Sequence, residues 1–188
     1  MKNDIIKFGK YDWVILAAKH DRTLIITENI IAQQPYHKPG GKITWDKCTL
    51  RSYLNGEFYN SFSPADRDRI IRVTNKNQNN QWWRNVPGGE PTRDYLFLLS
   101  LEEVTEYMGD KRLLKTRGNQ KYWIDDGNNE ARMARYGVFF AWWWLRSPGS
   151  VDYVASNVSA DGSISVNGCN VYVGSGGIRP ALWISRTE

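Results

Sequence analysis

Trp-Trp-Trp-Leu-Arg-Ser-Pro-Gly at residues 142–149 and Gly-Gly-Ile-Arg-Pro-Ala-Leu-Trp at residues 176–183 frame the C-terminal part of this chain. Residues 150–175 between them consist almost wholly of Ser, Val, Asn, Gly, Asp, Tyr and Ala, and they contain no Lys, Arg, Glu, Gln, Met or Trp. Aromatic, Arg and Pro residues on either side of small polar residues indicate a rigid frame around a displayed surface. We therefore expect the frame to fix the fold and residues 150–175 to bind a ligand.

Within this segment, apolar residues at intervals are expected to fill the core while their neighbours point outward. Asp161-Gly162 and Asn167-Gly168 each predict a hairpin turn. Substitutions at outward positions usually change stability by less than about 0.5 kcal/mol, so such a surface tolerates many sequences. The expected core residues are Ala155, Val158, Ile164 and Val171.

Tyr153 and Tyr172 are the expected contact anchors, because tyrosine offers a large rigid surface and one hydroxyl at low entropic cost. Alternatively, both tyrosines are half-buried residues of strands. The polar residues around them would supply hydrogen bonds, or would form a solvated loop. The expected ligand-binding residues are Val151, Asp152, Tyr153, Ser156, Ser159, Ser163, Ser165, Asn167, Cys169, Asn170 and Tyr172.

The chain before this block predicts both strands and helices. Residues 8–18 and 23–27 are rich in β-branched and apolar residues, which predicts a hairpin, and residues 93–99 predict a buried strand. Apolar residues recur at helical spacing from 50 to 58, which predicts an amphipathic helix.

Two further helix starts follow from capping signals. Ser63 precedes Pro64 and stands three residues before Asp66, and Ser100 stands three residues before Glu103. Gly109 is a plausible end of the second of these helices. Residues 112–137 are expected to be irregular.

This order of elements predicts one α+β domain over residues 1–188, with two main helices around a small mixed or antiparallel sheet and a loop-rich C-terminal third. The 188 residues are 41% hydrophobic and 24% charged, as in ordinary soluble domains. No stretch approaches the roughly 18 apolar residues of a membrane span, and the N-terminus lacks the apolar run of a signal peptide. The location stays open between a phage particle, a cell surface reached through a partner, and the cytoplasm.

The sequence predicts no metal site, cofactor or catalytic residue. Cys48 and Cys169 lie too far apart in the sequence for a metal motif, so two free thiols are expected, with one long-range disulfide as the alternative. His20 and His37 have no Cys, Asp or Glu partner at ligand spacing.

A loose basic run between residues 111 and 121 raises the question of nucleic acid. A nucleic-acid site requires exposed aromatic residues interleaved with the basic ones, and only Tyr122 and Trp123 follow. The run therefore favours a solvated surface over a nucleic-acid site or a docking patch for a partner protein. Its members are Lys111, Arg112, Lys115, Arg117 and Lys121.

The chain resembles, over nearly its full length, a family of bacterial and phage domains of the C-type-lectin fold, some of which are variable proteins of diversity-generating retroelements. The two motifs at 142–149 and 176–183 are the most specific part of the resemblance. Weaker motifs occur in the expected order, and they are Trp45, Leu50-Arg51-Ser52-Tyr53-Leu54-Asn55, Phe58-Tyr59, Phe62-Ser63, Asp94-Tyr95-Leu96-Phe97-Leu98-Leu99-Ser100 and Glu102-Glu103.

The resemblance implies a non-catalytic protein that recognises a protein or surface ligand through a diversified C-terminal segment. In such systems a reverse transcriptase randomises the adenines of a template, and randomised Asn codons cannot yield Lys, Glu, Gln, Met or Trp. None of these five residue types occurs in 150–175, although an exposed Ser/Asn/Gly-rich loop would avoid them as well. An undiversified interaction module of a phage or cell-surface assembly is the first alternative.

The second alternative is an oxidase, because formylglycine-generating enzymes share the fold and bind copper through cysteines. Here the two cysteines are remote in the sequence, and Leu145-Arg146-Ser147-Pro148-Gly149 replaces the motif of those enzymes. Arg146 and Arg179 are expected to be structural, with each guanidinium stacked on Trp or bonded to loop carbonyls. The oligomeric state and the identity of the ligand stay open.

Overall fold

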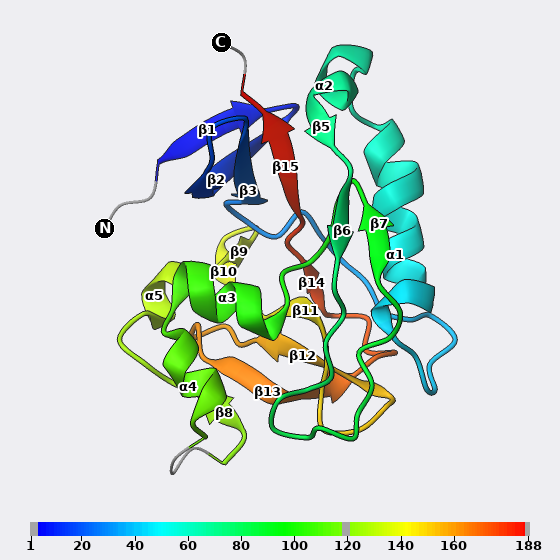
Figure 1. Ribbon diagram of the computed structural model, residues 1–188, viewed down its shortest axis with the longest axis vertical. Helices are drawn as coiled ribbons and strands as arrows, with labels where there is room; N and C mark the ends of the chain where they lie inside the picture. The colour runs from blue at the N-terminus through cyan, green and yellow to red at the C-terminus, as the bar shows by residue number, and fades with distance from the viewer. Residues whose placement is uncertain (1–3, 118–120, 187–188) are drawn as a thin grey trace.

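A computed structural model describes residues 4–117 and 121–186, which form two main β-sheets with helices beside them (Figure 1). The architecture is mixed α+β with two main helices, as the sequence predicts, but it has two main sheets instead of one small sheet, and the C-terminal third contains several strands where loops were expected. Residues 1–3 and 187–188, and residues 118–120 within the expected irregular segment, lie outside the described residues. Over the described ranges, no helix is long and apolar enough to cross a membrane.

The first sheet, sheet A, is antiparallel and has the strand order β1-β2-β3-β15-β5. The hairpin of β2 and β3 confirms the prediction, but a turn at Gly9-Lys10 divides the expected strand 8–18 into β1 and β2. The first strand, β1, and the last, β15, therefore belong to one sheet, in which β15 pairs with β3 and β5 (Figure 1). The strands are β1 (Ile5–Phe8), β2 (Tyr11–Ala18), β3 (Arg22–Thr27), β15 (Ala181–Ser185) and β5 (Ile70–Ile71).

The second sheet, sheet B, has the order β4-β14-β11-β12-β13-β8 and contains the expected binding segment. Its pairs are antiparallel except for β11 with β14, which makes the sheet mixed. The strands are β4 (Ala32–Gln33), β14 (Gly177–Ile178), β11 (Trp143–Pro148), β12 (Val154–Val158), β13 (Ile164–Asn170) and β8 (Trp123–Ile124).

Helices α2 and α3 begin where their capping residues predict. The Ser63 hydroxyl accepts a hydrogen bond from the backbone N–H of Asp66, and Ser100 and Glu103 form a complete capping box. The helical segments are η1 (Trp45–Lys47), α1 (Thr49–Tyr53), which continues into the π-helix η2 (Leu54–Phe58), α2 (Pro64–Arg69), α3 (Leu101–Met108), α4 (Lys111–Lys115) and α5 (Asn129–Arg132).

The expected irregular segment 112–137 contains more structure than predicted. It holds most of α4, all of α5, strand β8 and the strand β9 (Arg135–Tyr136), which pairs with β10 (Phe139–Phe140). These elements are two to five residues long, so each carries too few residues for a periodic signal.

The predicted strand 93–99 is only partly correct. Strand β7 (Thr92–Asp94) pairs with β6 (Val73–Asn75), and the chain then bends at Tyr95-Leu96 and continues as a buried segment without a continuous ladder. Phe97 exchanges two backbone hydrogen bonds with Ala181 of β15, and the Leu99 carbonyl accepts from the Arg146 N–H of β11. The segment therefore bonds to both sheets in turn, which an apolar run cannot reveal.

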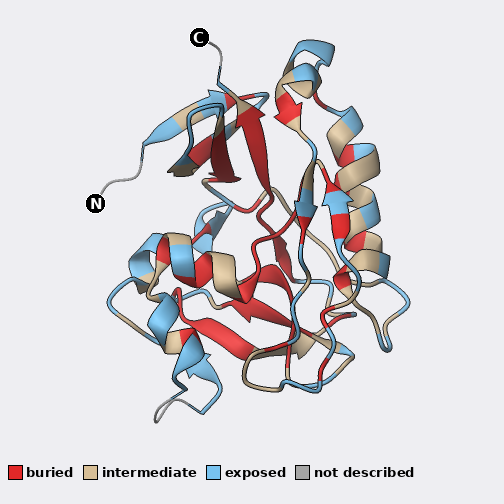
Figure 2. Cartoon of the chain, viewed as in Figure 1, coloured by how far each residue is buried: buried red, intermediate tan, exposed pale blue. Residues whose placement is uncertain are grey.

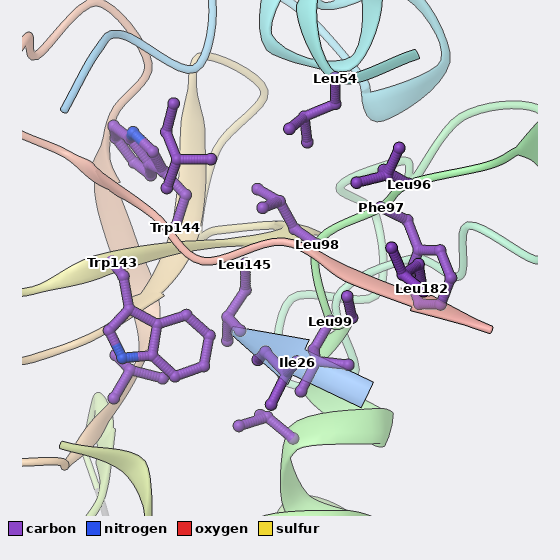
Figure 3. Packing of buried hydrophobic residues seen from close by; sticks show 14 of the residues in the cluster. Ile26, Leu54, Leu96, Phe97, Leu98, Leu99, Trp143, Trp144, Leu145 and Leu182 are labelled. Carbon is purple, nitrogen blue, oxygen red and sulfur yellow. The ribbon is translucent and has the colours of Figure 1, made fainter. Parts of the chain in front are cut away.

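This segment is the centre of the core. Leu96, Phe97, Leu98 and Leu99 are buried, and Figure 3 shows them between Leu54 of η2 and the side chains of the two sheets. One cluster of buried hydrophobic side chains includes residues of sheet A, sheet B and the helices. Both cysteines are free thiols, and Cys48 lies within this cluster.

The buried carboxylate of Asp94 connects the helical segments η1 and α1 to strands β6 and β7. The Asp94 side chain is fully buried and accepts hydrogen bonds from Trp45 Nε1 at 3.1 Å and Asn75 Nδ2 at 2.9 Å. It also accepts from Thr92 Oγ1 at 2.6 Å and pairs with Arg51 Nε at 2.7 Å. Four donors from η1, α1, β6 and β7 compensate for the burial of one charge.

We expect Asp94→Ala to lower the free energy of unfolding by about 3–5 kcal/mol, because it leaves the Arg51 charge and three other donors without their acceptor. Chemical denaturation measures this change. Asp12→Ala is the control, since Asp12 pairs with Lys7 on the surface, where such a pair contributes about 0–1 kcal/mol. Equal effects of the two substitutions would contradict the structural role of Asp94.

Candidate ligand-binding surface

Strands β12 and β13 form the hairpin that carries the expected binding residues, and most of its length is buried (Figure 2). The four expected core residues, Ala155, Val158, Ile164 and Val171, are at most 1% exposed, which confirms that prediction. Asp161-Gly162 forms the turn between the strands, as predicted, with Gly162 at φ +84°.

Three serines that were expected to point outward are buried instead. Ser156 Oγ donates to the Pro148 carbonyl at 2.8 Å, and Ser163 Oγ donates to Asp161 Oδ1 at 2.7 Å. Ser165 Oγ accepts from the Gly168 N–H at 3.0 Å. Their hydroxyls satisfy polar groups of the fold, so these three serines do not belong to the exposed surface.

Asn167-Gly168 is not a second hairpin turn, because it lies inside β13. Ala155 pairs with Cys169 and Asn157 pairs with Ser165, so β13 has extra residues opposite β12 and forms a bulge. Gly168 has φ +84°, a conformation that favours glycine. The Asn-Gly pair is typical of both features, which is why the sequence did not separate them.

The bulge leaves half-buried positions in the second half of β13. Asn167, Cys169 and Asn170 are partly exposed there, and burial raises the pKa of the Cys169 thiol above its ordinary value. Ser159 is also half-buried, but it lies at the turn, where its N–H bonds to the Ser163 carbonyl. The length of β12 separates Ser159 from the other partly exposed residues.

The exposed residues gather where the chain enters β12 and leaves β13. Val151, Tyr153 and Tyr172 are 36%, 45% and 59% exposed, and the Val171 N–H donates to the Tyr153 carbonyl at 3.2 Å. This bond holds the two tyrosine-bearing segments side by side. We call the group formed by Val151, Asp152, Tyr153, Asn170 and Tyr172 the tyrosine patch.

The loop 37–43 borders the tyrosine patch, a contribution that the sequence did not predict. The His37 N–H bonds to the Val171 carbonyl and the Ile43 N–H to the Asp152 carbonyl, each at 2.9 Å. Lys42 Nζ lies 2.9 Å from the Asp152 carboxylate. The Pro-Gly-Gly sequence at 39–41 signals a loop, but nothing in it indicates which strand the loop contacts.

Asn80 ties a second loop to the same sheet. Its Nδ2 donates to the carbonyls of Pro148 at 2.8 Å, Gly149 at 3.1 Å and Val166 at 3.0 Å. Its Oδ1 accepts from the N–H groups of Trp82 and Trp83. One buried amide thus fixes the loop around residue 80 against β11 and β13.

The two frame arginines are structural, as expected. Arg146 Nη1 donates to the Leu98 carbonyl at 2.7 Å, and its guanidinium pairs with Glu103. Arg179 Nε donates to the Thr27 carbonyl at 2.7 Å, and its guanidinium lies over the Trp143 ring. Within the described residues, no group of three or more His, Cys, Asp or Glu side chains lies close enough to hold a metal ion.

Comparison with known proteins adds a family but no activity. The family described as a domain of unknown function, DUF6273, matches residues 20–186. No curated protein and no solved structure matches the chain.

We expect Ser165→Tyr to lower the free energy of unfolding by about 1–3 kcal/mol or more, because a large side chain must enter a closely packed site. Tyr172→Ser should change it by less than about 0.5 kcal/mol, because Tyr172 is exposed. Chemical denaturation of both variants gives the comparison. A large loss on Tyr172→Ser would place that tyrosine in the core rather than on the surface.

The Asp161 turn predicts a pH dependence of stability. Hydrogen bonds from the backbone N–H and the hydroxyl of Ser163 hold the pKa of the Asp161 carboxyl below its ordinary value, and the positive charge of Arg132 adds to this. The stabilisation is fully present above the unfolded pKa of about 4 and is lost as the pH falls through the lower folded pKa.

The melting temperature of Asp161→Asn relative to the unchanged chain, measured from pH 6 to pH 2, tests this. We expect the unchanged chain to be the more stable at pH 6 and the difference to shrink as the pH falls below about 4. A difference that stays constant with pH would show that the carboxylate charge does not stabilise the turn.

Proposed function

Because the chain belongs to the DUF6273 family, whose function is unknown, we propose a function from its geometry: it is a non-catalytic binding protein that recognises a protein or surface ligand through the tyrosine patch. The observation that supports this most directly is the exposure of Tyr153 and Tyr172 on two segments held together by a backbone hydrogen bond. Exposed tyrosines on a rigid support are typical of binding surfaces.

Packed residues beneath the tyrosine patch support the proposal that the patch is held rigidly. Trp143, Trp144 and Leu145 of β11 are fully buried, as are Ile178 of β14 and Leu182 of β15. The patch side chains therefore extend from the ends of strands whose interiors are packed. Rigid aromatic contacts lose little entropy on binding, which favours affinity.

We extend the proposal to diversification by a retroelement and to the C-type-lectin fold. The resemblance of the two frame motifs supports both, and the absence of five residue types from 150–175 supports diversification. The pairing of β15 with β3, which brings the ends of the chain into one sheet, is compatible with that fold. Burial limits diversification to exposed positions, since Ser156, Ser163 and Ser165 serve the fold.

An undiversified interaction module is the second candidate, and it would use the same tyrosine patch. The oxidase alternative receives less support. The Cys48 side chain is fully buried in the hydrophobic cluster, so it is not exposed to a substrate in solvent, and burial raises the pKa of its thiol to about 12.

A display library tests whether the patch is a binding surface. Val151, Asp152, Tyr153 and Tyr172 are randomised together, and the library is selected against a panel of purified proteins. We expect folded binders, because exposed substitutions change stability little and the frame stays rigid. A control library randomises the exposed residues Lys19, His20, Asp21 and Arg186, where the β2–β3 turn lies beside the end of β15. Equal yields from both libraries, or unfolded patch variants, would contradict the proposed surface.

The DNA beside the gene tests diversification separately. Diversification requires a reverse transcriptase gene and a near-copy of the segment for 142–183 that carries adenines at the codons for Val151, Asp152, Tyr153 and Tyr172. If both are absent while the patch library yields binders, the undiversified module is the correct candidate.

A further inference from the structure

Three aromatic rings and a guanidinium from distant parts of the sequence meet on another part of the surface. The rings of Trp83 and Tyr122 are nearly parallel, with centroids 6.2 Å apart and planes at 8°. The guanidinium carbon of Arg117 lies 5.3 Å from the ring centroid of Trp82 and 5.1 Å from that of Trp83. Tyr122 keeps 47% of its surface exposed and the adjacent Trp123 keeps 46%.

An open hollow of about 480 Å³ lies next to this aromatic cluster. Its lining includes the amides of Gln78, Asn79 and Gln81, the cations of Arg84 and Lys115, and the apolar Leu114. Among the described residues, no carboxylate lines it. A hollow with cations and amides but no acid is suited to an anionic ligand that also accepts hydrogen bonds.

The cations around the hollow are available to a ligand. Arg84 and Lys115, which line the hollow, and Lys121, which precedes Tyr122 in the sequence, are exposed, and no carboxylate of the described residues lies within ion-pair distance of them. Arg112, by contrast, is held by Asp110 at 2.6 Å.

The surface is fixed by hydrogen bonds within the fold. Trp82 Nε1 donates to the Leu114 carbonyl at 3.0 Å, and Asn79 Nδ2 donates to the Arg84 carbonyl at 2.9 Å. The Tyr122 carbonyl accepts from the Val166 N–H at 3.0 Å, which anchors Tyr122 to β13. Both sides of the cluster are therefore attached to the folded core.

We propose that this surface binds a nucleotide, with the base stacked on the exposed ring of Tyr122 and the phosphate near Arg84 and Lys115. The nucleotide is either free or a unit of single-stranded nucleic acid, since both combine a stacking base with a negative phosphate. In the sequence only Tyr122 and Trp123 follow the basic run, and the fold adds Trp82 and Trp83 beside one of its members, Arg117. The inference does not depend on the tyrosine patch.

Two probes distinguish the sources: a fluorescently labelled ten-residue oligothymidylate, followed by anisotropy, and unlabelled thymidine monophosphate as competitor. Binding of the oligonucleotide with weak competition by the monophosphate indicates a single strand, and tight binding of the monophosphate indicates a free nucleotide. If neither probe binds the intact chain at millimolar concentration in low salt, the proposal is wrong.

Tyr122→Ala should weaken binding about 5- to 150-fold, the range found when one stacking aromatic is removed. Lys115→Gln should reduce the slope of log affinity against log salt for the oligonucleotide by about 0.7, because one phosphate contact is lost. If the ligand is a free nucleotide, Lys115→Gln should weaken its binding at low salt. This difference from the unchanged chain should disappear at high salt.

The control variants are Tyr136→Ala on β9, Lys7→Gln on β1 and Tyr153→Ala in the tyrosine patch, and none should change binding by more than about twofold, within the spread expected of remote surface changes. If Tyr153→Ala weakened nucleotide binding as much as Tyr122→Ala does, the proposal of a site separate from the tyrosine patch would be wrong. Equally tight, Tyr122-dependent binding of an oligogalacturonate would overturn the nucleotide as ligand, since that polymer is acidic but has no base.

Discussion

The guanidinium groups of Arg132 and Arg179 hold together the parts of the structure that present both surfaces. Arg132 is fully buried and donates to the carbonyl of Gly162 in the β12–β13 turn and to that of Met108 in α3. Its own carbonyl accepts from Trp143 Nε1 and from Arg179, which also bonds to Thr27 of β3. The two residues thus connect sheet A, sheet B and α3. Burial lowers the pKa of Arg179 to about 10, which leaves it charged at neutral pH.

The sequence correctly predicted those elements that depend only on residues close together in the chain. The capping residues Ser63 and Ser100 marked two helix starts, because a cap requires only its own turn. Gly109 was correctly placed at a helix end, yet it is not left-handed there; a side chain would meet Arg132 Nη1 at 2.8 Å. That reason depends on a residue far along the chain. The structural role of Arg132 likewise had no local signal.

The prediction of the binding residues failed where it relied on alternation along a strand. Alternation assumes that one face of the sheet meets solvent. Residues 155–158 are all buried although successive side chains point to opposite faces, so both faces of β12 are covered. Asn80 explains the covering, since it fastens its loop to the carbonyls of Pro148 and Val166. Small hydroxyl residues fit in such a layer, and their size and polarity resemble those of exposed loop residues.

This covering also explains where ligand contacts are physically possible. In the described part of sheet B, exposed aromatic side chains lie next to the ends of β12 and β13 and beside β8, where Tyr122 accepts backbone hydrogen bonds from Val166 and Asn167. The tyrosine patch and the aromatic cluster therefore share β13 as support but use different side chains. Substitutions in either group leave the strand interior unchanged, because backbone bonds and buried serines maintain it. On the proposed function, residues at the strand ends can then vary without the fold having to be rebuilt.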